Sequence, residues 1–311
     1  MQKKTISIII PVYNENGVLG KLFTQLDGVM KYTNHNFEFI FVNDGSIDES
    51  LETLLRLAES DARIKVVDLA RNFGQQVAVT AGLDYAAGDA IVLMDADMED
   101  RPEDIIKFLE KWEQGYEVIY AVRQRRSVSL LRRICFSIFH RLNKIIYDDF
   151  PIDACGIFGL MDKKVTENLN KLRERNRYIP GLRGWIGFKQ IGIRLDRGER
   201  YNKRSRVEFA KLLALAFNSY FAFSNKPLRI ASVLGILLSF LTFISIIIVI
   251  ILKLFINFKV PGWASLVAII LFISSVQFMC MGIMGEYIGR IYEETKGRPL
   301  YIIKNIYGMN D

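Results

Sequence analysis

The sequence predicts an α/β domain with a mainly parallel sheet, followed by two long apolar segments. In the N-terminal part, short apolar runs that end in polar loops alternate with segments of helical spacing, up to a helix opened by Pro102. This alternation is typical of parallel strands joined by helices that cover both faces of the sheet. Residues 230–252 and 262–285, in contrast, contain no charged residue.

The predicted strands cover residues 5–12, 37–42, 64–69 and 90–94, and the predicted helices between them cover residues 18–30, 49–60 and 75–87. In sheets of this class, ligands bind beyond the carboxyl ends of the strands. The loops at those ends contain polar residues after all four strands, namely Tyr13, Asn14, Glu15, Asp44, Arg71, Asp95 and Asp97. We therefore expect a binding site at this edge of the sheet.

Each apolar segment is long enough to cross a bilayer, which takes about 20 residues. The alternative is a pair of buried core helices. The short link at 253–261 predicts a transmembrane hairpin spanning residues 230–285, with both ends on one side. Arg and Lys are more numerous on that side than in the link, which favours a cytoplasmic domain and a cytoplasmic tail at 286–311, in the inner or plasma membrane.

Residues 129–146 and 207–229 combine apolar side chains at helical spacing with Arg and Lys. They are either helices packed on the domain or helices that lie in the membrane interface, and the second leads into the hairpin. The net charge of +7 is concentrated around these segments. This placement favours lipid headgroups and phosphates over nucleic acid as partners. Three scattered cysteines agree with a reducing compartment.

Asp95 and Asp97 directly follow a buried strand. In extended chain, residues i and i+2 point the same way, so both carboxylates can face one ligand. Two hard oxygen donors suit Mg²⁺ or Mn²⁺ with substrate phosphates completing the shell, and Glu99 continues the spacing. The alternative is a solvated acidic turn.

Asp44 lies at a second strand end. In one interpretation its carboxylate accepts the N–H of a nucleobase. In the other it is a helix N-cap or a turn residue, and Asp48 is an equally good cap. These two roles stay open from the sequence.

Short motifs occur in a fixed order along the chain: Pro11-Val12-Tyr13-Asn14-Glu15, Asn43-Asp44-Gly45-Ser46, Arg71-Asn72-Phe73-Gly74, Ala81-Gly82, Gly88-Asp89, Asp95-Ala96-Asp97, and residues 223–229, 285–292 and 296–301 around the apolar segments. This ordered set resembles family 2 glycosyltransferases. The subgroup that it resembles is the polyprenyl-phosphate glycosyltransferases, which include bactoprenol glucosyltransferases and dolichol-phosphate mannose synthases.

The resemblance implies a Rossmann-like GT-A fold for residues 1–206. It implies that Pro11, Tyr13, Glu15 and Asp44 hold the nucleotide, and that Asp95, Asp97 and Glu99 surround the metal ion. It also implies phosphate-binding cations before the first apolar run, where Ser205-Arg206 resembles a Ser-Lys pair and Arg197 and Arg200 are further candidates. We add Arg71 to the donor site and expect Asp97, Arg200 and Arg206 to be catalytic.

The sequence departs from the family at three positions. Ile157 and Gly159 stand where relatives commonly have an acidic residue and Arg, and Lys203 stands where many have Gly. The acidic residue is often treated as the catalytic base. A phosphate acceptor is mostly dianionic at neutral pH and needs little proton removal, whereas an alcohol acceptor needs a base far more. The departure therefore favours a phosphate acceptor. The alternative, which we favour less, is that Asp153 replaces the missing base through a loop shift.

The resemblance, together with these residues, implies an inverting transferase that moves a hexose from a UDP-sugar, such as UDP-glucose, to undecaprenyl phosphate for cell-envelope glycosylation. We expect a homo-oligomer in contact with membrane lipids. The first alternative is an inactive scaffold of the same fold that partners a flippase. The second is a polysaccharide synthase, which two membrane spans are too few to support.

Overall fold

The computed structural model describes residues 3–123, 155–175, 177–195 and 262–309, with isolated positions between 228 and 251. The chain divides into two compact units, which are described separately. The first contains residues 1–207 and 298–311, and the second contains residues 208–297.

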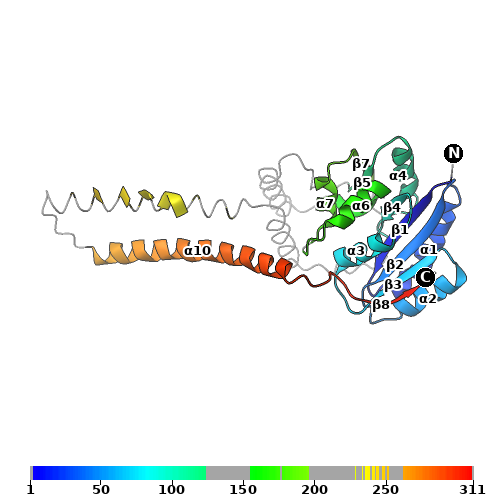
Figure 1. The fold of residues 1–311 in the computed structure, drawn as a ribbon, viewed down its shortest axis with the longest axis horizontal. Helices are drawn as coiled ribbons and strands as arrows, with labels where there is room; N and C mark the ends of the chain where they lie inside the picture. The colour runs from blue at the N-terminus through cyan, green and yellow to red at the C-terminus, as the bar shows by residue number, and fades with distance from the viewer. Residues whose placement is uncertain are drawn as a thin grey trace. The chain divides into compact units, whose positions relative to one another are not determined.

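The first unit is built on one mixed sheet with the strand order β7-β5-β6-β4-β1-β2-β3-β8 (Figure 1). Its strands are β1 (Thr5–Val12), β2 (Asn36–Asn43), β3 (Ile64–Leu69), β4 (Ala90–Leu93), β5 (Val118–Arg123), β6 (Cys155–Asp162), β7 (Gln190–Leu195) and β8 (Ile303–Tyr307). The neighbours β4, β1, β2 and β3 are parallel, as the sequence predicts. The strands β6 and β8 are antiparallel to their neighbours, which makes the sheet mixed.

Helices cover both faces of this sheet. They are α1 (Asn16–Met30), α2 (Ser50–Ser60), α3 (Gln75–Tyr85), α4 (Asp104–Glu113), α6 (Lys163–Lys171) and α7 (Ile179–Trp185). Leu19, Leu22 and Leu26 of α1 recur at helical spacing and pack with Ile8 of β1 in the main hydrophobic core. The opposite face of β1 carries Ile9, which is fully buried and lies against α3 at Gly82. The strand is therefore buried on both sides, as its continuous apolar run predicts.

The end of the chain differs from the expectation of a simple tail at 286–311. Residues 303–307 form β8, which pairs antiparallel with β3. The last turn fits closely against that strand, because Gly308 has φ +73° and a Cβ there would lie 2.3 Å from the Ile64 carbonyl oxygen. A half-exposed edge strand of five residues carries too weak an apolar pattern to be predicted.

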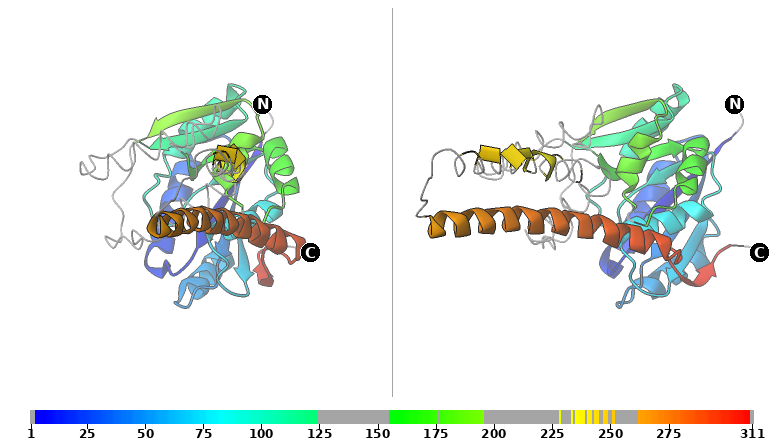
Figure 2. Two further views of the ribbon diagram at one scale, coloured as in Figure 1. Left: turned by 90° about the vertical axis from the view of Figure 1, so that its left-hand side faces the viewer. Right: turned by 60° about the vertical axis from the view of Figure 1, so that its left-hand side comes forward.

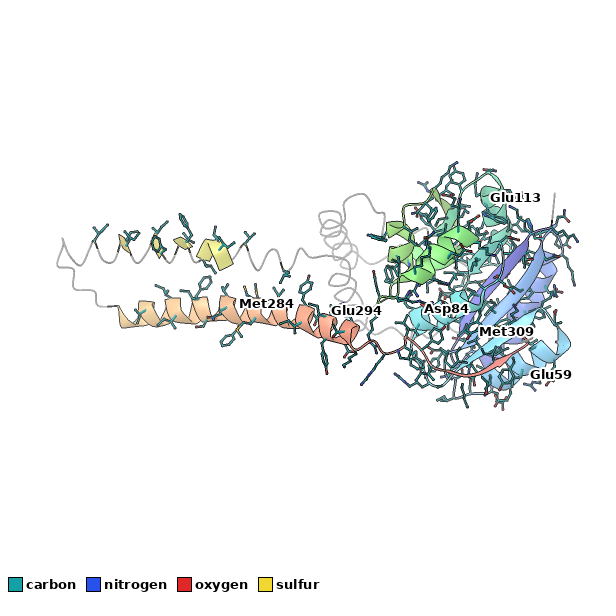
Figure 3. The ribbon with its side chains drawn as sticks, in the orientation of Figure 1. Glu59, Asp84, Glu113, Met284, Glu294 and Met309 are labelled. Carbon is teal, nitrogen blue, oxygen red and sulfur yellow. The ribbon has the colours of Figure 1, made fainter. Side chains whose placement is uncertain are left out.

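The second unit contains α10 (Trp263–Thr295), a single continuous helix of 33 residues (Figure 2). Large apolar side chains project from it and are mostly exposed, including Phe272 at 63% and Phe278 at 71% (Figure 3). None of the helices formed by the described residues combines the length and apolar character needed to span a bilayer. The predicted interfacial segment at 129–146, nearly all of the segment at 207–229 and about half of the first apolar run lie outside the described residues.

Candidate active site

The carboxyl ends of the four parallel strands meet at one edge of the sheet. Val12 at the end of β1 pairs with Asn43 at the end of β2, and Asn43 pairs with Asp68 near the end of β3. On the other side of β1, the Met94 N–H just after β4 donates to the Ile9 carbonyl at 3.1 Å. The loops that follow these strands therefore lie side by side. Apart from Pro11, which lies in β1, they contain the described residues that the sequence singles out for donor and metal binding.

The loops after β1 and β2 are bonded to each other. The Asn14 N–H donates to Ser46 Oγ at 3.0 Å, and the Ile47 N–H donates to Asn14 Oδ1 at 2.9 Å. Asn14 adopts φ +54°, a conformation that Asn tolerates better than most residues. Between these loops Pro11 is buried in the sheet, while Tyr13 is 39% exposed and available to a ligand.

Asp44 is a buried carboxylate that organises the next loop. Its two oxygens accept the backbone N–H groups of Phe73 at 2.7 Å and Gly74 at 2.9 Å. Burial raises the pKa of the Asp44 carboxyl, against the opposing effect of these two donors and of the Arg71 charge. At the start of α2, Asp48 Oδ1 accepts the Ser50 N–H, whereas Asp44 binds the N–H groups of Phe73 and Gly74, which directly precede α3.

The segment from Ala70 to Gln75, here the 70–75 loop, contacts both acidic strand ends. Besides its two bonds to Asp44, it donates from Gln75 Nε2 to Asp95 Oδ1 at 2.5 Å. It also packs directly on the β2 loop, because a Cβ at Gly45 would lie 2.5 Å from the Arg71 carbonyl carbon. Arg71 itself stacks on Phe73, with its guanidinium carbon 4.2 Å from the ring centroid.

Asp95 and Asp97 are half-buried and follow β4, but the chain there is not extended. It turns at residues 96–97, Asp97 Oδ1 accepts the Glu99 N–H at 3.1 Å, and Met98 has φ +60°. The simple i, i+2 alternation expected for this segment is therefore wrong. Within the described part of the chain, no three acidic, His or Cys side chains gather closely enough to hold a metal ion. Two carboxylates with hard oxygen donors still fit a divalent ion whose remaining ligands are phosphate oxygens and water.

The strand β6 runs past the end of β4 at this edge. Gly159 pairs with Leu93, the last residue of β4, so Ile157 lies beyond the end of that strand. The Ile157 side chain is buried. An Arg at position 159 has no room, because a Cβ there would lie 2.5 Å from the Ile119 carbonyl oxygen and 3.0 Å from Arg183. In this structure, position 159 therefore does not accommodate the Arg of the family pattern.

Two residues near this edge were missed by the sequence analysis. Gln75 was assigned only to a helix, although its place directly after a strand-end motif was a usable signal. Arg183 of α7 is 1% exposed and donates to the carbonyl oxygens of Gly156 and Ile157 at 3.3 and 3.4 Å. No pattern in the sequence distinguishes this buried arginine from a surface one. Arg197, Arg200, Lys203, Ser205 and Arg206 lie outside the described residues.

Comparison with known proteins agrees with this architecture. Residues 7–169 match the family model described as glycosyl transferase family 2, and residues 226–291 match the model described as the GtrB C-terminal hairpin. The chain is 45% identical to the uncharacterized glycosyltransferase YkcC of Bacillus subtilis (strain 168), over 98% of this chain and 95% of that protein. It is 36% identical to the bactoprenol glucosyl transferase of Shigella phage SfV, over 96% of this chain and 98% of that protein.

A prophage bactoprenol glucosyl transferase homolog of Escherichia coli (strain K12) is 35% identical, over 97% of this chain and 99% of that protein. Among solved structures, a complex of Mycobacterium tuberculosis glucosyl-3-phosphoglycerate synthase with Mn²⁺, UDP-glucose and phosphoglyceric acid has a TM-score of 0.48 at 15% identity, covering 68% of this chain and 76% of that one. That likeness is too slight to support an argument about ligands. The family match and the near full-length relatives establish that the chain belongs to glycosyl transferase family 2 and is a glycosyltransferase.

Proposed function

We propose that the protein transfers a hexose from a nucleoside-diphosphate sugar to a polyprenyl phosphate, with inversion at the anomeric carbon. The observation that carries the proposal is the convergence of two acidic strand ends, Asp44 and Asp95, on the single 70–75 loop. The edge of the sheet where they meet is the usual ligand site of this fold class. The acceptor class is supported by the relatives named bactoprenol glucosyl transferase.

In this proposal the donor nucleotide lies over the β1 and β2 loops, in contact with Pro11, Tyr13 and Glu15. Asp44 keeps the 70–75 loop in place and has further lone pairs for a base N–H. Asp95 and Asp97 would hold Mg²⁺ or Mn²⁺, with Glu99 as a further candidate. When bound, such an ion neutralises negative charge on the departing diphosphate. Gln75 fixes the orientation of the Asp95 carboxylate that would bind it.

The acceptor phosphate attacks the anomeric carbon, the bond from that carbon to the diphosphate oxygen breaks, and the nucleoside diphosphate leaves. Position 157 offers no acidic group for this step. A dianionic phosphate does not require one, since its second pKa lies near 6. The residues needed are instead cations that hold the acceptor phosphate in line with the donor, for which we propose Arg200 and Arg206.

We further propose that the second unit anchors the enzyme in the cell membrane through the hairpin at 230–252 and 262–285. Three observations support this: both runs lack charge, the apolar side chains of α10 are exposed, and the segment matches a hairpin family model. The excess of Arg and Lys at the outer ends of the hairpin favours a cytoplasmic catalytic unit. We also propose that the protein forms a homo-oligomer and that a flippase is its partner.

Purified full-length protein in detergent provides the test, with undecaprenyl phosphate as the acceptor and a panel of UDP- and GDP-hexoses as donors. We expect a lipid product that carries one hexose, strongest with UDP-glucose, dependent on Mn²⁺ or Mg²⁺, and absent in Asp97→Ala. Failure to consume any donor would instead support the inactive-scaffold alternative. A product with many sugars would support a polysaccharide synthase.

A further inference from the structure

The C-terminal segment of the first unit, residues 298–307, is bonded to the rest of that unit along β8 and just before it. The β3–β8 ladder continues one step beyond the strands, because the Ala70 N–H donates to the Ile302 carbonyl at 2.9 Å. The register shifts between Asp68 and Leu69, so that β8 bulges just before this bond. Bulges of this kind are common beside functional sites, where they redirect the chain. The final bond of the ladder therefore falls on the first residue of the 70–75 loop.

A side-chain cluster fixes the same segment to α3. Tyr301 Oη donates to Asp84 Oδ2 at 2.7 Å, and Arg173 holds both Asp84 oxygens at 2.7 and 2.8 Å (Asp84 is labelled in Figure 3). Burial raises the pKa of the Tyr301 hydroxyl, and the bond to Asp84 raises it further. The phenol therefore stays protonated and continues to donate at neutral pH. Arg175 adds a bond to the Arg298 carbonyl at 3.2 Å.

The 70–75 loop connects Ala70 to both acidic strand ends. Phe73 and Gly74 donate to Asp44, and Gln75 donates to Asp95. The backbone of the loop also lies against Gly45, where no room exists for even a Cβ atom. A shift of the loop would thus change the geometry of the proposed nucleotide and metal ligands together.

We infer that the C-terminal segment is a positioning element for the donor site, with Tyr301 as its main positioning residue. The inference rests on the proposed function, since the donor that it positions is the nucleoside-diphosphate sugar. The segment follows α10 in the chain, so the part of the sequence proposed to enter the membrane is continuous with the part that positions the donor loop. The bond at Ala70 and the cluster around Asp84 both fix residues that precede β8, so the contact with the first part of the chain extends beyond the strand itself.

The test is Tyr301→Phe in the full-length protein, which removes only the hydroxyl that donates to Asp84. The matched control is Tyr307→Phe, the same change at the opposite end of β8. Hydrogen–deuterium exchange of a peptide spanning the 70–75 loop is compared with that of a peptide from β1. A hydrogen bond to a charged group corresponds to a change of roughly tenfold to a hundredfold, so we expect amide exchange in the loop to accelerate by about tenfold or more in Tyr301→Phe alone.

In the transfer assay, we expect the KM for the donor to rise about three- to tenfold in Tyr301→Phe, with kcat and the KM for the acceptor within about twofold. Asp84→Asn, which removes the accepting charge, should act in the same direction. The inference is overturned if loop exchange is unchanged in Tyr301→Phe, or if it changes equally in Tyr307→Phe. Absence of a lipid product from the unmodified enzyme would refute the proposed function, while the exchange result would still decide the role of the segment.

Discussion

Replacing Gly45 with Ala probes the packing between the β2 loop and the 70–75 loop. Gly45 has φ +63°, and a Cβ there would lie 2.5 Å from both the Arg71 carbonyl carbon and the Asn72 nitrogen. Ordinary contact begins at 3.4 Å, so the two loops must separate by 3.4 − 2.5 = 0.9 Å. Neither backbone moves freely, because Phe73 and Gly74 are bonded to Asp44 on the same loop as Gly45.

The destabilisation has two parts. Left-handed backbone costs an L-residue about 1–2 kcal/mol, and overpacking of fixed atoms adds about 1–3 kcal/mol. Gly115→Ala isolates the first part, since Gly115 has φ +86° and nothing within 4 Å of its Cβ position. The difference between the two variants therefore reports the loop contact alone.

Thermal unfolding of the purified variants measures this difference. At about 2–4 °C per kcal/mol for a domain of this size, Gly45→Ala should melt about 2–12 °C below Gly115→Ala. The KM for the donor should rise only in Gly45→Ala, because only there does the 70–75 loop move. Equal melting temperatures together with an unchanged KM would refute the reasoning that the two loops form one rigid unit.

Three further predictions concern individual side chains. Gln75→Ala should raise the Mn²⁺ concentration needed for half-maximal activity by about tenfold or more, because Asp95 loses the partner that orients it, and an unchanged metal titration would contradict this. Burial raises the pKa of Asp44, so the folded state binds its proton more tightly than the unfolded state does. The contribution of the Asp44 carboxyl to the free energy of unfolding should therefore fall as the pH rises through the raised pKa. Melting temperatures of the unmodified protein and of Asp44→Asn, measured across a range of pH, test this direction. Arg63 lowers the pKa of Asp61, but its side chain is 40% exposed, so Arg63→Ala should reduce the free energy of unfolding by at most about 1 kcal/mol at neutral pH. This loss should disappear as the pH falls through the lowered pKa of Asp61. Glycosyl transfer should be unaffected.

The first half of the sheet was predictable because its strands are continuous apolar runs. Ile6, Ile8, Ile9 and Ile10 of β1 are all fully buried, and a continuous apolar run of this length is typical of a parallel strand that is covered on both faces. The remaining strands were not predicted, for physical reasons. The strand β6 contains two glycines and pairs with β4, about 70 residues earlier in the chain, a contact that no local pattern encodes.

The sequence was enough to predict which loops form the candidate site, but not which hydrogen bonds connect them. Strand-end positions placed Asp44, Arg71 and Asp95 at one edge, since parallel strands share that edge. The partners of those residues were not accessible, because the bonds from Phe73 and Gly74 to Asp44 come from backbone N–H groups, which carry no sequence signature. The turn after β4 was missed for a similar reason, as a local bond between Asp97 and the Glu99 N–H decides it.

In the proposed function, Asp95 and Asp97 would hold a divalent ion that would neutralise charge on the donor diphosphate. Calorimetric titration of UDP into the purified full-length protein, with and without Mn²⁺, tests this directly when it is repeated with Asp97→Ala. The account predicts that UDP binds to the unmodified protein only when Mn²⁺ is present, and that Asp97→Ala abolishes this binding while retaining the fold. Equal UDP affinity without the ion, or in Asp97→Ala, would contradict it.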